Sequence, residues 1–143
     1  MPDFGVSLVT KLLLQCLVLA PSPLTWGMQP AVAPPALRIP AGVPVYKSVS
    51  DEGIVYAIEG YDNRRCGIAV YGARESIYLP NVLKLVNSHY KQIHTGLADD
   101  GVSTYWEFSR TLNGNKSDVG ILTTESARPD DPALLVWVSD TKQ

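Results

Sequence analysis

The chain has little charge, few cysteines and few histidines. Charged residues make up 18% of its 143 residues, the formal net charge is −2, and the sequence holds two cysteines and two histidines. A nucleic-acid-binding domain normally presents a basic face, and the sequence shows none, so we expect no nucleic-acid partner. Hydrophobic residues make up 45% of the chain, which is typical of a folded globular protein with room for one domain.

Long apolar runs are also missing. The most apolar stretch near the N-terminus, LLLQCLVLA at residues 12–20, holds nine residues, whereas a membrane-spanning helix needs about 20. We therefore expect no stable membrane span. The run follows Lys11 and has the length of the apolar core of a secretory signal peptide.

We predict a signal peptide over residues 1–27, cleaved near Gly27, and hence a secreted, periplasmic or cell-envelope location. Two alternatives stay open: the run is the first helix of the domain, or Cys16 carries a lipid. The second is disfavoured because Gln15 stands where lipoproteins usually have a small residue. Removal of Cys16 leaves Cys66 unpaired, so a disulfide between these two cysteines is the least expected state.

Residues 28–44 are predicted to form a proline-rich linker. Five prolines between positions 29 and 44 remove backbone donors and favour extended conformations, which suits a semi-rigid spacer. The folded domain is then expected over residues 45–143.

That domain is predicted to be α+β, with a single antiparallel sheet of about five strands packed by one helix in the order β-β-α-β-β-β. One hairpin is expected from the apolar runs at 54–59 and 66–71, and Asn113-Gly114 predicts another. The helix is predicted between Pro80 and Gly96 from its apolar spacing. Residues 133–139 are apolar on both faces and are expected in the centre of the sheet.

An unpaired Cys66 allows three interpretations. It is a thiol nucleophile with His89 or His94 as base, and the neighbouring Arg64 and Arg65 favour its thiolate. Alternatively it is a small apolar core residue, or it forms an intermolecular disulfide. The core interpretation is the simplest because no known catalytic signature surrounds the residue.

The sequence predicts no metal and no cofactor. His89 and His94 are five residues apart on the predicted helix, so their side chains point about 140° apart and do not share a metal ion. The phosphate-loop, G-x-S-x-G and H-E-x-x-H motifs are also missing from the sequence.

Candidate binding residues lie in two places. Residues 102–109 alternate, so Tyr105 and Glu107 are expected on the face opposite the core. Tyrosine and arginine are frequent in binding hot spots, and Arg64 and Arg65 complete the predicted set. We therefore predict a small exported binding or accessory protein, of inhibitor or immunity type, that acts by contact with a protein partner without catalysis. The alternatives are a cysteine-dependent hydrolase using Cys66 and a helix histidine, and a structural or assembly subunit that forms homo-oligomers.

Overall fold

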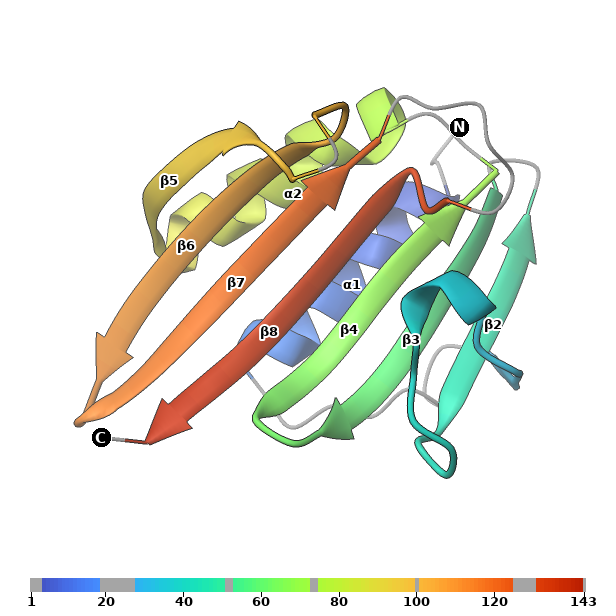
Figure 1. The fold of residues 1–143 in the computed structure, drawn as a ribbon, viewed down its shortest axis with the longest axis horizontal. Coiled ribbons are helices and arrows are strands. Elements are labelled where there is room, and N and C mark those ends of the chain that lie inside the picture. Colours follow the sequence, from blue (N-terminus) through green and yellow to red (C-terminus); the bar gives the residue numbers. More distant parts are fainter. Residues whose placement is uncertain are drawn as a thin grey trace.

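The computed structural model describes residues 4–18, 28–50, 53–72, 75–99, 101–124 and 131–142. In these ranges the chain forms one antiparallel sheet of eight strands in the order β1-β2-β3-β4-β8-β7-β6-β5. Two α-helices cover one face of the sheet (Figure 1). In chain order the elements are α1 (Phe4–Val18), β1 (Gln29–Pro30), the short 3-10 helix η2 (Pro35–Leu37), β2 (Val45–Ser50), β3 (Gly53–Tyr61), β4 (Arg64–Tyr71), α2 (Glu75–His89), β5 (Lys91–Leu97), β6 (Thr104–Leu112), β7 (Asn115–Thr123) and β8 (Leu134–Lys142).

The predicted sheet of about five strands packed by one helix is wrong. Beyond the five predicted strands the structure has β1, β2 and β5, and it adds the helix α1. The sequence predicts the segment of β5 as the end of the helix, but α2 stops at His89 and the next residues pair with β6. Most of β5 is exposed, and Ile93 is 51% exposed. Its side chains therefore carry no clear periodicity, and backbone pairing with β6 decides its conformation.

Both predicted hairpins are confirmed. β3 and β4 pair across a short loop, and β6 and β7 pair across Asn113-Gly114. Asn113 and Gly114 both have positive φ values, 55° and 80°, as a two-residue hairpin turn requires. The predicted central position of the last strand is also confirmed, because β8 lies between β4 and β7.

Helix α1 supplies a large part of the core. Its buried side chains recur at the three- and four-residue spacing of one helix face, and they pack with α2 and with the covered face of the sheet. They are Val9, Leu12, Leu13, Cys16 and Leu17. The structure therefore shows this apolar run as the first helix of the fold, one of the two open alternatives. Removal of residues 1–27 stays a prediction about processing.

Cys16 and Cys66 form a disulfide that joins α1 to β4, and their Cα atoms lie 6.1 Å apart. This corrects the expectation that Cys66 is unpaired and that this bridge is the least expected state. The covered face of β4 brings Cys66 against the buried side of α1, where Cys16 is 1% exposed.

The C-terminal end of α1 is held by two arginines. Arg65 donates from Nη1 to the carbonyl oxygens of Cys16 (2.8 Å) and Leu17 (3.1 Å), and Arg110 donates to Leu17 at 3.3 Å. Arg65 also makes two hydrogen bonds to the Asp140 carboxylate, at 2.9 and 2.6 Å, and these raise the pKa of Arg65. Cationic side chains at a helix C-terminus satisfy its last carbonyls and oppose its dipole.

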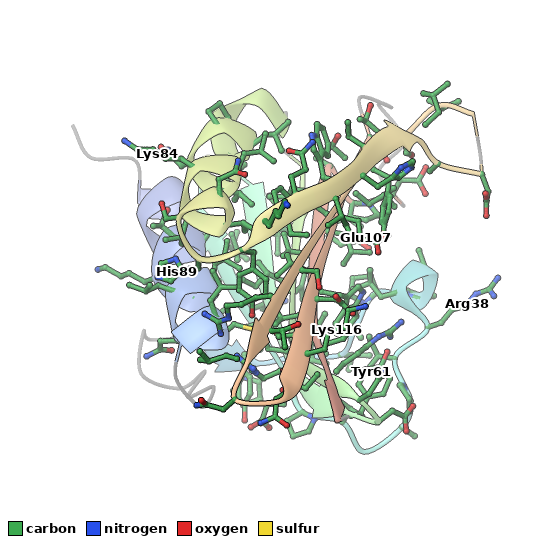
Figure 2. All side chains as sticks on the ribbon, turned by 90° about the vertical axis from the view of Figure 1, so that its left-hand side faces the viewer. Arg38, Tyr61, Lys84, His89, Glu107 and Lys116 are labelled. Carbon is green, nitrogen blue, oxygen red and sulfur yellow. A yellow bond between two sulfur atoms is a disulfide. The ribbon has the colours of Figure 1, made fainter. Side chains whose placement is uncertain are left out.

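The second face of the sheet is covered only in part. The segment predicted as a linker contains β1, which pairs with β2 at the edge of the sheet, and η2, which lies on the face opposite the helices (Figure 1). The amide of Glu59 donates to the carbonyl of Pro44 at 3.0 Å, which attaches this segment to β3. In the turned view the helices lie on one side of the sheet and η2 on the other (Figure 2). Over β6, β7 and β8 the second face carries a pocket, and we call this region the open face.

Candidate functional site

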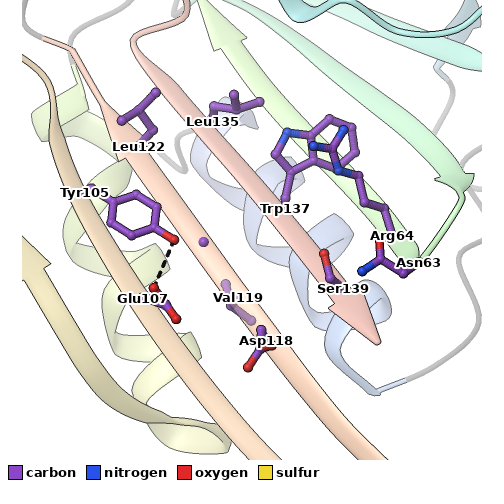
Figure 3. Close-up of a pocket in the computed structure, with 11 residues that line it drawn as sticks. Asn63, Arg64, Tyr105, Glu107, Asp118, Val119, Leu122, Leu135, Trp137 and Ser139 are labelled. Carbon is purple, nitrogen blue, oxygen red and sulfur yellow. Dashed lines mark hydrogen bonds between the residues drawn. The ribbon is translucent and has the colours of Figure 1, made fainter. Parts of the chain in front are cut away.

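The open face contains a pocket with a volume of about 440 Å³. Its lining residues come from β6, β7, β8, the first residue of β4 and the loop before it, so strands distant in sequence build one site (Figure 3). The lining residues are Asn63, Arg64, Tyr105, Glu107, Asp118, Val119, Gly120, Leu122, Leu135, Trp137 and Ser139.

Two glycines leave room for the two aromatic rings of the pocket. Trp137 pairs with Gly67 on one side and with Gly120 on the other. A Cβ atom on Gly67 would lie 2.6 Å from Trp137 Cε3, so no larger residue fits beneath that ring. A Cβ atom on Gly120 would lie 3.4 Å from the Tyr105 hydroxyl. The rings can therefore lie over the backbone of the neighbouring strands and form walls of a shallow site.

One end of the pocket is cationic. The guanidinium carbon of Arg64 lies 4.3 Å from the centroid of the Trp137 ring and 5.1 Å from that of Tyr61. Arg64 also donates a hydrogen bond to the Tyr61 hydroxyl, and the Tyr61 ring meets Trp137 edge-on with centroids 5.8 Å apart. These contacts hold the guanidinium in place through cation–π attraction and a hydrogen bond.

The other end is acidic. Tyr105 donates from its hydroxyl to Glu107 Oε2 at 3.3 Å (Figure 3). Burial and, next, the negative charge of Glu107 raise the pKa of Tyr105, so the phenol stays a hydrogen-bond donor. Asp118 Oδ1 is buried and has no hydrogen-bond partner in the described structure. Lys116 Nζ lies 3.9 Å from it, beyond hydrogen-bonding distance.

The pocket brings together three of the four predicted binding residues. Arg64, Tyr105 and Glu107 all line it, whereas Arg65 contacts α1 and Asp140. Successive side chains of a strand point to opposite faces. The shift in β4–β8 register between Arg64 and Cys66 is a bulge that re-aims its neighbours, so Arg64 faces the pocket while Arg65 and Cys66 both face the helices.

Trp137 and Asp118 also line the pocket, and neither is among the predicted binding residues. Both could have been found from the alternation of their strands: Val119, Ile121, Val136 and Val138 are all buried against the helices. Asp118 and Trp137 are adjacent in sequence to these buried residues, so their side chains point to the opposite face of the sheet. The predicted alternation of β6 is confirmed in the same manner, because Phe108 is fully buried while Tyr105 and Glu107 line the open face.

The predicted cysteine–histidine candidates do not meet. Cys66 is bonded to Cys16 on the helix side and has no free thiol in this structure. His89 ends α2, and its Nδ1 lies 3.1 Å from the carbonyl of Leu85. His94 lies on β5 opposite Glu107, not in the last turn of a helix as predicted. His89 is labelled on the helix side of the molecule and Glu107 on the other (Figure 2), so the sheet separates the two histidines.

Comparisons with known proteins add no relative. No protein-family model, no curated protein and no solved structure matches the chain. The described residues contain no group of three or more histidine, cysteine or acidic side chains that could hold a metal ion. No helix among them is long and apolar enough to cross a membrane. The function is therefore inferred from the chemistry of the pocket.

Proposed function

We propose that the protein is a non-catalytic binding protein that captures a partner protein at the open-face pocket. The observation that carries this proposal is the convergence of Trp137, Tyr105 and Arg64 on one half-exposed site. Tryptophan, tyrosine and arginine are the residue types that contribute most to the free energy of protein–protein binding.

The construction of the site also supports binding. Its side chains stand on paired strands of one sheet, and Arg64 is stacked and hydrogen-bonded before any partner arrives. Such preorganisation reduces the entropy lost on association. The lining residues include neither a histidine nor a thiol, so the site does not have the cysteine and histidine that the hydrolase alternative requires.

Truncation of Tyr105 should weaken partner capture. A partner is first isolated from the exported fraction of the native source with the immobilised full chain. Tyr105→Ala is then expected to weaken its binding by about 30-fold, the effect of losing a hot spot worth about 2 kcal/mol. Calorimetry or surface plasmon resonance measures the dissociation constant.

Leu112→Ala is the control, because Leu112 lies on the same strand, is 57% exposed and does not line the pocket. Circular dichroism shows whether both variants keep the fold. The proposal fails if no partner is captured, or if Tyr105→Ala binds as tightly as Leu112→Ala.

We also propose that the protein is exported. The Cys16–Cys66 disulfide supports this, because structural disulfides persist mainly in oxidising compartments. Cleavage near Gly27 and this disulfide exclude each other in one mature chain, since cleavage removes Cys16.

Intact-mass measurement without reductant should therefore decide the state of the N-terminus. Because α1 packs in the core, we expect the protein from the envelope or medium to have the mass of the full chain less two hydrogens. A mass corresponding to residues 28–143 would instead support the signal peptide. A full chain with free thiols confined to the cytoplasm would contradict export.

A further inference from the structure

We infer that the partner inserts a basic side chain, lysine or arginine, into the open-face pocket, with its cationic head against Glu107 and Asp118. This inference rests on the proposed function and names the chemistry that the partner must supply.

The acidic end of the pocket has unmet hydrogen-bonding capacity. Asp118 Oδ1 is buried and accepts no hydrogen bond from the described residues, although a buried carboxylate oxygen is costly without a donor. Glu107 lies on the adjacent strand, and both carboxylates line the pocket (Figure 3). The Asp118 side chain as a whole is 30% exposed, so a partner ammonium or guanidinium can reach this carboxylate from the pocket and oppose its charge together with that of Glu107.

The surface that leads to these carboxylates is lined by apolar and aromatic side chains. Leu122, Leu135 and the rings of Tyr105 and Trp137 line the same depression. Lysine and arginine carry a long methylene stem that packs on such surfaces while the head group reaches a charge. A short polar side chain would leave this apolar wall uncovered, and an apolar one would leave the carboxylates without a donor.

The charges around the pocket set the orientation of the inserted basic side chain. Arg64 occupies the opposite end and is stacked on Trp137, so a cation is repelled there and drawn to Glu107 and Asp118. Lys116 Nζ lies 3.9 Å from Asp118 Oδ1, and His94 pairs with Glu107 across β5 and β6. Lys116 is too far from Asp118 for a hydrogen bond, so the head group of a partner can take that place.

Selection of random heptapeptides displayed on phage against the immobilised, oxidised full chain tests this inference. Peptides eluted from the protein should be enriched in lysine or arginine by about threefold over the starting library. A synthetic copy of the strongest binder should lose about tenfold in affinity when its basic residue is replaced by norleucine, which keeps the stem and removes the charge. The double variant E107Q/D118N should cause a similar loss, and added salt should weaken binding to the unmodified chain.

Glu59→Gln is the control, since it removes a carboxylate that lies outside the pocket. The outcomes distinguish the basic-side-chain inference from the proposed binding function. Enriched apolar or acidic peptides that lose binding to Tyr105→Ala would overturn the basic-side-chain inference and leave the binding function in place. Failure to enrich any peptide that depends on Tyr105 would contradict both.

Discussion

Removing the Cys16–Cys66 disulfide with the double substitution C16A/C66A is expected to lower the free energy of unfolding of the full chain by about 4 kcal/mol. The bridge closes a loop between residues 50 apart in sequence. In the chain-entropy model a loop of this length restricts the unfolded ensemble strongly, and the folded chain loses little because both positions are already ordered. Alanine is the suitable replacement because Cys16 and Cys66 are 1% and 6% exposed, so a serine hydroxyl would add a burial penalty.

Urea denaturation followed by tryptophan fluorescence measures this effect. Adding a reductant to the unmodified chain should reproduce the loss, and adding it to C16A/C66A should change nothing, which separates the disulfide from other effects of the substitutions. An unmodified chain whose unfolding midpoint is the same with and without reductant would show that the bridge does not stabilise the fold.

Leu13→Ala is expected to lower the free energy of unfolding by about 3 kcal/mol, in the range found for buried leucine truncations. Leu13 is 0% exposed and belongs to the main core, together with Phe108, Val136 and Val138 of the sheet. The substitution removes buried apolar surface and leaves a cavity beneath α1. The same urea titration reports the change.

Leu14→Ala is the control, because Leu14 is the next residue of the same helix and is 43% exposed. Both variants change leucine to alanine in α1, so helix propensity is matched and burial alone differs. We expect Leu14→Ala to cost less than about 1 kcal/mol. Equal and small losses for the two variants would mean that α1 does not pack in the folded protein.

The packing of α1 also affects the binding site. The last carbonyls of α1 are held by Arg65, and Arg65 follows Arg64 directly at the irregular pairing of β4 with β8. The contact of Arg65 with α1 and Asp140 on one face and the stacking of Arg64 on Trp137 on the other hold this segment from both sides. Loss of α1 would therefore remove one of the supports that position the cationic end of the pocket.

Local patterns were sufficient to predict the hairpins and the exposed face of β6. Asn113-Gly114 adopts the positive φ values of a tight hairpin turn, which these two residue types favour locally. The strict alternation in β6 places Tyr105 and Glu107 on one face and Phe108 on the other, since successive side chains of a strand point in opposite directions. The alternation of β6 alone therefore predicts that Tyr105 and Glu107 lie on the face opposite the core.

Other features depended on which segments meet. An apolar run with a cysteine suits both a signal peptide and a buried helix, because both require the same short hydrophobic sequence. The exposed β5 has no side-chain period to distinguish it from the end of α2, and only its hydrogen bonds to β6 make it a strand. The eight-stranded sheet and the place of α1 could therefore not be derived from local sequence.

The sequence by itself determined the hairpin turns, the central apolar strand β8 and the outward direction of Tyr105 and Glu107, because turn geometry and strand alternation act over a few residues. Only the tertiary structure decided that Cys16 meets Cys66, that Arg64 rather than Arg65 faces the pocket, and that Trp137 lies over Gly67 beside Asp118 and Tyr105. These arrangements require strands distant in the chain to lie side by side, and the pairing of whole strands sets that proximity.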